Sequence, residues 1–244
     1  RVTSVKDQNP YGTCWAHATL GSVESLLLTS RKGEFDFSEK HLANTHGRDN
    51  GFSEGGNGDM GISYLARLSG PIDEREDPYP DSSYYNSWAR KYNENNEYLR
   101  ELKVSKSPAG TPLMQALNVV QLTPLDAGKV DTARLNAIKE AVRDYGAVYV
   151  SYNHVWGALS ADTKNFYWNG NENVVDYRGS GGHAVLIVGW DDNYSKSKFK
   201  YTPPDNGAFL VRNSWGSDIG DGGYLYYSYY DETFARGELF SWRT

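Results

Sequence analysis

Cys14 is the single cysteine of this 244-residue chain, and a thiol is one of the few side chains that can act as a nucleophile. A free thiol has a pKa of about 8.5, so little thiolate forms at neutral pH unless the surroundings stabilise it. Apolar residues after Cys14 recur at helical spacing, which predicts a helix over residues 14–30 with Thr13 at its N-cap. Cys14 would then lie in the first turn, where free N–H groups and the helix dipole favour an anion. Because a lone cysteine can also be an inert core residue, the reactive interpretation requires a base.

His183 begins a strand-like run that ends at Trp190, and it is the best placed of five histidines to be that base. A strand end is a rigid platform, and Gly182 before it lets other backbone approach. A catalytic imidazole also needs an acceptor that orients it. Asn213 ends the next predicted strand, so the two strand ends could bring these side chains together. Trp215 could then shield their hydrogen bond from water.

The other four histidines fit other roles better. His17 lies on the helix of the cysteine and is predicted to be structural. His41 and His46 lie on or beside a polar helix and are expected to be solvated. His154 follows a predicted strand and could lie near a cleft, but the sequence shows no partner for it.

Three segments, in this order along the chain, resemble the papain family of cysteine peptidases: Gln8-Asn9-Pro10-Tyr11-Gly12-Thr13-Cys14-Trp15-Ala16, Gly182-His183-Ala184-Val185, and Asn213-Ser214-Trp215-Gly216 followed by Gly222-Gly223-Tyr224. One such segment would be a weak indication, but three in order with spacing near that of the family are a strong one. The resemblance spans the chain from about Val2 to Tyr230. It implies an α+β fold of two lobes, a helical N-terminal lobe and a C-terminal lobe built on an antiparallel β-sheet or barrel, with the active-site cleft between them.

The resemblance also implies the roles of four residues. Cys14 would be the nucleophile, His183 its ion-pair partner and later general acid, and Asn213 the residue that holds the imidazole in the right tautomer. The side-chain amide of Gln8 and the backbone N–H of Cys14 would form the oxyanion hole. The implied activity is that of a cysteine endopeptidase that hydrolyses peptide bonds through a thioester acyl-enzyme.

For the substrate, the resemblance implies a protein or peptide bound in extended conformation. Gly55 and Gly56 look like the glycine pair of the family, whose backbone pairs with the substrate by β-strand addition. The expected substrate-binding residues are Gly55, Gly56, Gly58, Gly182 and Trp215. Gly58 lies near where the family often has a bulkier residue, which suggests a roomier specificity pocket.

Two alternative functions keep the same fold. The acyl-enzyme could pass its acyl group to an amine, which would make the protein a transpeptidase or a dedicated processing enzyme for one surface protein. The chain could also be a non-catalytic binding module that retains the fold. The presence of the complete set of four residues named above speaks against the binding module.

The chain departs from the family pattern at several positions. Tyr11 stands where the family signature has a cysteine, so the usual neighbouring disulfide is missing, and Thr13 replaces a serine or alanine. Cys14 and His183 lie 169 positions apart, which is more than the signature suggests and indicates long loops. Ile219 stands where the family usually has a second tryptophan. None of these changes removes a catalytic group.

The pattern of helix and strand supports the two lobes, predicted as residues 1–118 and 119–244 of one peptidase domain. Beyond the first helix, helical segments are expected at residues 38–44, 62–68, 88–102 and 131–145. Runs rich in β-branched and aromatic residues predict strands at residues 147–152, 183–190, 208–213 and 224–229, with a long hairpin loop over residues 191–207.

Composition excludes several other classes of function. The formal net charge of −6 argues against a nucleic-acid binder, and no apolar run approaches the length of a membrane span. One cysteine allows no zinc spacing, and the acidic residues Asp49, Glu54 and Asp59 do not match a calcium loop, so no metal or cofactor is expected. The chain begins at Arg1 without a signal-like segment, so we expect a mature peptidase whose pro-segment inhibitor has been removed. Its low cysteine content, with one cysteine, and its acidic surface favour a secreted or cell-surface bacterial protein over a cytoplasmic one.

Overall fold

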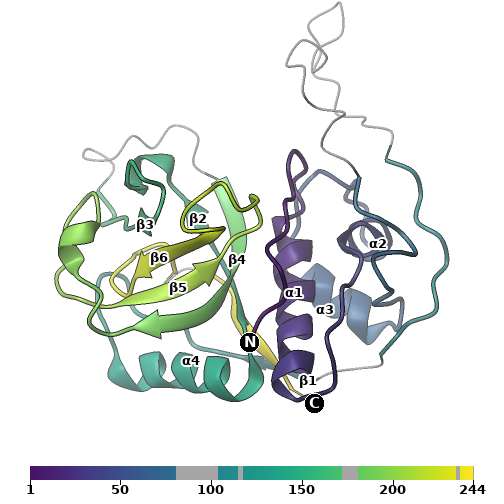
Figure 1. The fold of residues 1–244 in the computed structure, drawn as a ribbon, viewed down its shortest axis with the longest axis horizontal. Helices are drawn as coiled ribbons and strands as arrows, with labels where there is room; N and C mark the ends of the chain where they lie inside the picture. Colours follow the sequence, from purple (N-terminus) through teal and green to yellow (C-terminus); the bar gives the residue numbers. More distant parts are fainter. Residues whose placement is uncertain (81–103, 115–117, 172–180, 235–236, 244) are drawn as a thin grey trace, which may run out of the picture.

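The structure is a computed structural model that describes residues 1–80, 104–114, 118–171, 181–234 and 237–243. Two lobes lie side by side, one built around helices and the other around a sheet (Figure 1). The helices are α1 (Cys14–Thr29), α2 (Glu39–Thr45) and α3 (Gly58–Ala66) in the first lobe and α4 (Thr132–Tyr145) in the second. The predicted two-lobed α+β fold is confirmed.

Within the described residues, seven strands form one sheet in the order β1-β7-β2-β4-β5-β6-β3. Their bounds are β1 (Asn118–Gln121), β2 (Val148–His154), β3 (Asn165–Phe166), β4 (Gly181–Asp191), β5 (Ala208–Arg212), β6 (Tyr224–Ser228) and β7 (Leu239–Arg243). All neighbours pair antiparallel except β3 and β6, which are parallel. Two short 3-10 helices, η3 (Trp156–Ala158) and η4 (Lys196–Lys198), lie in the connections.

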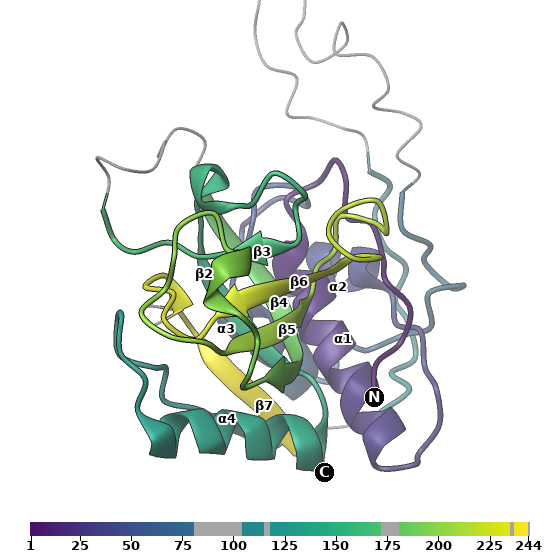
Figure 2. The same ribbon diagram turned by 60° about the vertical axis from the view of Figure 1, so that its left-hand side comes forward.

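The central strands send alternate side chains into two different cores. Val148 and Val150 of β2 belong to the core shared with α4, whereas Tyr149 between them belongs to the core around α1. Likewise Leu239 of β7 faces the first core and Phe240 faces the second. This follows from the two-residue period of a strand, and it means that the sheet is buried on both faces in its middle. Figure 2 shows α4 running beside β7 along one edge of the sheet lobe.

The strongly patterned elements lie where the sequence predicts them. The helix expected at 131–145 is α4, and the carboxylate of Asp131 caps it by accepting the backbone N–H of Arg134 at 3.0 Å. Helix α2 starts after Ser38, whose hydroxyl accepts the N–H of His41 at 3.0 Å. The four predicted strands are β2, β4, β5 and β6, and η4 lies in the loop between β4 and β5.

Other predictions needed correction. Helix α3 begins four residues before the expected 62–68, because Asn57 caps it and accepts the N–H of Met60 at 3.2 Å. Strands β1, β3 and β7 were not predicted, since they are short and depend on partners far away in the sequence. The helix expected over residues 88–102 lies outside the described residues.

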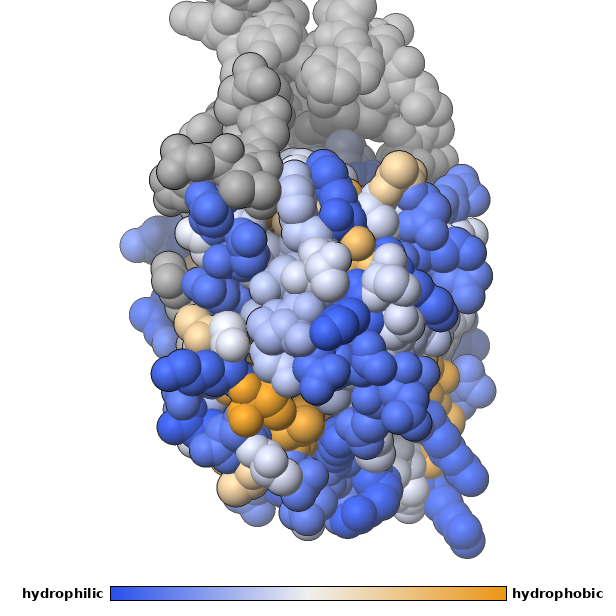
Figure 3. All heavy atoms as spheres, turned by 90° about the vertical axis from the view of Figure 1, so that its left-hand side faces the viewer, coloured by the Kyte–Doolittle hydropathy of each residue, from blue (hydrophilic) through white to orange (hydrophobic). Residues whose placement is uncertain are grey.

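The face of the sheet lobe that points away from the helical lobe is polar over most of its area (Figure 3). Hydrophobic side chains show on this face only in small areas (Figure 3). Within the described ranges, no helix combines the length and the apolar character that a membrane crossing needs.

Candidate active site

Cys14 is the first residue of α1, as the sequence predicts, but its helix is not capped by the side chain of Thr13. The Thr13 hydroxyl instead lies 2.5 Å from the hydroxyl of Tyr79, and the Thr13 carbonyl accepts the first helical N–H groups. Burial raises the pKa of the Cys14 thiol, and the backbone N–H groups of Ala184 and Trp15 oppose that effect. The thiol is therefore held in a site that disfavours an isolated charge.

His183 lies near the start of β4, and its imidazole is oriented by Asn213, the residue after β5. The His183 Nε2 and Asn213 Oδ1 atoms are 2.8 Å apart, and the same Oδ1 accepts the N–H of Ser214 at 2.8 Å. An amide oxygen can only accept, so Nε2 carries the proton and Nδ1 is the acceptor of the neutral ring. Trp215 stacks on His183 with ring centroids 4.5 Å apart, and both His183 and Asn213 are buried. Burial lowers the pKa of His183 to about 4, although the hydrogen bond to Asn213 works in the opposite direction.

Gln8 is fixed between the two lobes through both its side chain and its backbone. Its side-chain Oε1 accepts the Ser214 hydroxyl at 2.7 Å, and its Nε2 donates to the Tyr11 carbonyl at 2.9 Å. Its backbone N–H donates to the Ser214 carbonyl at 2.8 Å, and its carbonyl accepts the N–H of Tyr11 at 2.9 Å. An amide nitrogen carries two hydrogens, so the side chain can still donate to a negatively charged oxygen in the adjoining cavity.

These groups surround one cavity of about 470 Å³ at the boundary of the lobes. Among the predicted residues, the cavity is lined by Gln8, Cys14, Gly55, Gly56, Gly182, His183 and Trp215. Asn213 does not line the cavity and is connected to it by its hydrogen bond to His183. Gly58 does not line it: a Cβ there would meet Phe240 at 2.4 Å, so the space beside Gly58 is filled by Phe240. Beside Gly55 and Gly182 there is open space, with no heavy atom of the described residues within 4 Å of an added Cβ.

Several residues of the cavity wall were not predicted from the sequence, including Asn57, Tyr149, Ser151, Tyr152 and Trp156. Trp156 stacks on Trp215 with centroids 5.1 Å apart, so a second tryptophan stands beside Trp215 although position 219 is isoleucine. The sequence signal for this wall was His154, which follows the predicted strand 147–152 and was expected to lie near a cleft, and it does line the cavity. Burial and neighbouring His183 lower the pKa of His154 to about 3, so it is a neutral member of the wall.

The expectation that His41 and His46 are solvated is wrong, since each is only 2% exposed. His41 Nδ1 lies 2.7 Å from the Tyr64 hydroxyl, and its Nε2 lies 3.1 Å from the Pro108 carbonyl. Burial lowers the pKa of both imidazoles. His17 is also buried, and its Nδ1 lies 3.0 Å from the Thr13 carbonyl at the start of α1.

Comparison with known proteins places this arrangement in a family. Residues 1–235 match the family described as papain family cysteine protease. Falcipain-3 of Plasmodium falciparum is 29% identical over 231 residues, and procathepsin L of Rattus norvegicus is 26% identical over 227 residues. Both alignments cover 92% of this chain, which spans 38% and 56% of the length of these two curated relatives.

Among solved structures, the cysteine protease and lectin-like domains of Cwp84, a surface layer associated protein of Clostridium difficile, superpose with a TM-score of 0.71. The two chains are 26% identical, and the match covers 99% of this chain and 49% of the Cwp84 chain. The family match spans nearly the whole sequence and agrees with the two-lobed fold. The chain therefore belongs to the papain family of cysteine proteases.

Proposed function

We propose that this chain is a cysteine endopeptidase in which Cys14 is the nucleophile and His183 the general acid and base. The observation that carries the proposal is the convergence of three groups on one cavity: a thiol at a helix N-terminus, an imidazole oriented at 2.8 Å by Asn213, and the side chain of Gln8. These are the nucleophile, the base with its orienting group, and an oxyanion donor that acyl transfer requires.

The charge state of the pair follows from burial. Burial disfavours a lone thiolate and a lone imidazolium, but transfer of the thiol proton to His183 Nδ1 creates both at once and leaves the net charge unchanged. The attraction between the two opposite charges in a site of low dielectric offsets the desolvation of each. The N-terminus of α1 adds to the stabilisation of the sulfur anion. The reactive form is therefore the thiolate–imidazolium pair.

Hydrolysis then proceeds in two halves. The Cys14 sulfur attacks the carbonyl carbon of the substrate, and the carbonyl electron pair moves to the oxygen, which accepts hydrogen bonds from Gln8 and from the backbone N–H of Cys14. The C–N bond breaks as the imidazolium of His183 donates its proton to the leaving amine. In the second half, His183 removes a proton from water as the water oxygen attacks the thioester carbon; the C–S bond then breaks, the acid product leaves, and the Cys14 thiolate and the His183 imidazolium are restored.

The open space beside Gly55 and Gly182 suits a substrate backbone that lies along the cavity. Gly55 has a φ of +85° and no side chain, so an extended peptide can approach its backbone and pair with it as an added strand. We therefore propose that Gly55, Gly56 and Gly182 line the path of the substrate, with Trp215 at the other end of the cavity.

We further propose that the protein is made with a pro-segment inhibitor and that it acts outside the cell or at the cell surface of a bacterium. Similarity to procathepsin L, a protein named as a precursor, supports the first idea. Similarity to Cwp84, which is a surface layer associated protein of a bacterium, supports the second.

The proposed chemistry can be tested by alkylation. The reduced protein is incubated with a peptidyl epoxide that reacts with active thiols, and its intact mass is measured beside its rate of peptide hydrolysis. We expect one adduct per chain and loss of hydrolysis in parallel. The variant C14A should gain no adduct and show no hydrolysis.

The matched control is N213A, which keeps the thiol but removes the group that orients His183. It should still form the adduct, only more slowly. A folded wild-type protein that gains no adduct and cleaves no peptide would contradict the proposal and favour a binding module.

A further inference from the structure

A brace outside the catalytic set fixes the segment that carries both oxyanion donors. Tyr79 lies in the loop that follows Asp73, over residues 74–80. Its hydroxyl donates to the backbone carbonyl of Gln8 at 2.9 Å. The same hydroxyl oxygen lies 2.5 Å from the Thr13 hydroxyl. Because a phenol has one proton, Thr13 is the donor in the second contact. A single side chain therefore connects the residue before the Cys14 helix with the residue whose amide faces the cavity.

The ring of Tyr79 is held in place from three sides. Its centroid lies 4.9 Å from that of His17, 5.9 Å from that of Tyr11 and 6.0 Å from that of Phe52. The rings of Tyr11 and Phe52 also meet edge to face, with centroids 5.1 Å apart. Such contacts each contribute on the order of 1 kcal/mol and fix the ring orientation. The ring contacts therefore fix the direction in which the Tyr79 hydroxyl points, which is toward the Gln8 carbonyl.

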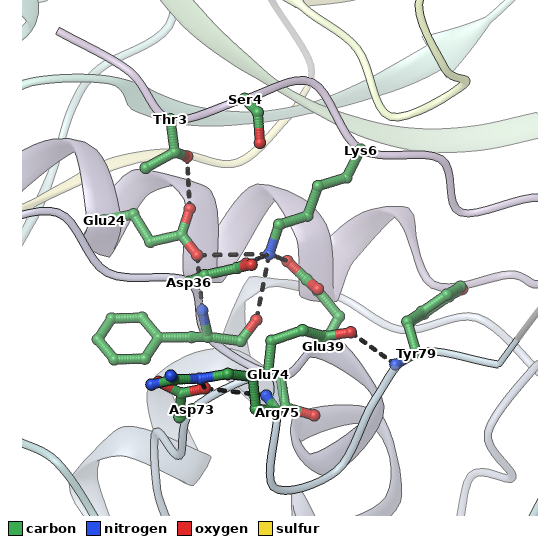
Figure 4. Close-up of polar contacts among 12 residues, drawn as sticks. Thr3, Ser4, Lys6, Glu24, Asp36, Glu39, Asp73, Glu74, Arg75 and Tyr79 are labelled. Atoms are coloured by element: carbon green, nitrogen blue, oxygen red, sulfur yellow. Dashed lines mark hydrogen bonds and ion pairs between the residues drawn. The ribbon is translucent and has the colours of Figure 1, made fainter.

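The backbone of Tyr79 is held by the carboxylate of Glu74, which lies beside the charged groups around Lys6 (Figure 4). Glu74 Oε1 accepts the N–H of Tyr79 at 2.6 Å, while Glu74 Oε2 is buried with no hydrogen-bond partner among the described residues. Next to it, Lys6 Nζ contacts Asp36 at 2.6 Å and Glu39 at 2.7 Å. Glu74 thus fixes the backbone of Tyr79 within the loop, and its own N–H donates to the Asp36 carbonyl at 2.8 Å, which attaches the loop to the helical lobe.

The segment from Gln8 to Thr13 needs such a brace because it has no covalent one. Tyr11 stands where the family signature has a cysteine, and the single cysteine of the chain is Cys14, so no disulfide can tie this segment down. A further attachment to the helical lobe is the N–H of Gly12, which donates to the Ser53 hydroxyl at 3.1 Å. Oxyanion donors act only when they are held at hydrogen-bonding distance from the position that the developing negative charge occupies.

We propose that Tyr79 is a positioning residue for the oxyanion hole, acting through the carbonyl of Gln8 and the hydroxyl of Thr13. This inference rests on the proposed function of Gln8 and Cys14. Its consequence is specific to one step. Tyr79 supports attack on a carbonyl, where a negative charge develops on oxygen, but it is not needed for alkylation of the thiol by a small halide, where no such charge forms.

The test compares Y79F with Y194F. Both lose one tyrosine hydroxyl, but that of Tyr194 donates to Asn165 in the sheet lobe, away from the cavity. For Y79F we expect kcat for peptide hydrolysis to fall about tenfold, which is the effect of losing a hydrogen bond of about 1.4 kcal/mol. Its KM and its rate of alkylation by iodoacetamide should stay within about twofold of wild type, and its thermal midpoint should match that of Y194F.

A double-mutant cycle shows whether Tyr79 acts through Gln8. In the Q8A background, which should itself lower kcat by about 10²–10³-fold, Y79F should cost less than about twofold more. A Y79F variant with the kcat of Y194F, or one whose alkylation rate falls as much as kcat, would overturn the proposal. So would full additivity with Q8A. A wild-type protein without hydrolysis and without alkylation at Cys14 would overturn the proposed function itself, which is a distinguishable result.

Discussion

The helical lobe and the sheet lobe fix their parts of the site with different kinds of contact. On the helical side, Lys6 is surrounded by carboxylates, including the fully buried Glu24 and Glu39, and Lys40 pairs with buried Asp77 at 2.5 Å. On the sheet side, the residues around His183 are mostly aromatic. Tyr152 meets it edge to face at 5.8 Å, and Trp215 stacks on it. The helical lobe is therefore held in part by buried ion pairs, whereas rings and hydroxyl groups surround His183.

The difference has a physical consequence. Charged contacts change with pH, since a carboxyl that takes up a proton no longer attracts a lysine. Stacked rings and hydrogen bonds between neutral groups do not change over the same range. We therefore expect the contribution of the ion pairs in the helical lobe to stability to depend on pH. The contribution of the contacts around His183 should be nearly independent of pH. The following variants test this comparison, starting with the largest expected effect.

K6M should cause the largest loss of stability. Burial alone would lower the pKa of Lys6, but Glu39 and Glu24 raise it above its ordinary value, so the lysine stays charged. Removing it leaves two buried carboxylates without a cation, which costs about 3–5 kcal/mol. Burial already raises the pKa of the Glu24 and Glu39 carboxyls, and their pKa should rise further when Lys6 is absent. The loss of stability should therefore become smaller as the pH falls and these carboxyls take up protons. Urea unfolding of K6M and wild type at pH 7 and pH 5 measures this loss of stability. An equal loss at both pH values would show that the charges around Lys6 do not control it.

Y152F is the corresponding change on the sheet side. The Tyr152 hydroxyl lies 2.9 Å from His154 Nδ1 and 2.5 Å from the Tyr227 hydroxyl, all buried. Removing it leaves two polar groups without their partner, at a cost of about 1–3 kcal/mol. The cost should be the same from pH 5 to pH 8, because burial lowers the pKa of His154 to about 3 and the ring stays neutral. Unfolding by urea across that range checks this, and a loss that varies with pH would break the contrast between the lobes.

N213A should shift the acidic limb of the profile that relates the rate of Cys14 alkylation to pH. For wild type, the rate should be half-maximal at or below about pH 4, because burial lowers the pKa of His183 to about 4. The hydrogen bond to Asn213 works against burial and raises that pKa, so its loss should move the limb to still lower pH and reduce the maximal rate. Rates with iodoacetamide from pH 3 to pH 8 give the profile. A wild-type limb near pH 6.5, or a shift to higher pH in N213A, would show that burial does not control the base.

E74Q should have the smallest effect, and it should increase stability. Burial, with Glu39 nearby, raises the pKa of Glu74 to about 7 in the folded protein. A raised carboxyl pKa means that the folded state holds a proton that the unfolded state has lost, so stability falls as the pH rises towards 7. Glutamine avoids this loss. The thermal midpoint of E74Q should exceed that of wild type at pH 8 and equal it near pH 4.5. A midpoint below wild type at pH 8 would mean that the charged form of Glu74 is needed.

The sequence indicated the proposed reacting groups more directly than it indicated the residues that support them. Cys14, His183 and Asn213 could be found because their residue types and their places at element ends reflect the chemistry directly. The supports lack such a pattern. Lys6, its carboxylates and Tyr79 come from separate segments, and only folding brings them together.

The same limit applies to the elements. Strong periodicity identified α1 and α4, but β7 owes its existence to pairing with β1 and β2. The buried histidines His41 and His46 were missed because a polar sequence around a residue does not show what covers it in three dimensions. In this chain, local patterns predicted the elements with strong periodicity, whereas the short strands and the contacts between distant segments could not be read from the sequence.

The sheet with two buried faces makes the two lobes dependent on each other. A fragment that ended near the start of the sheet would expose the apolar face of α1 that Tyr149, Phe240 and Trp242 cover in the whole chain. The remaining fragment would expose those same side chains to water. The core around α1 is therefore shared by both halves, whereas the core packed against α4 is built from residues 125–239 alone. The core behind the helix that begins at Cys14 is thus complete only when β7, the last strand of the chain, is in place.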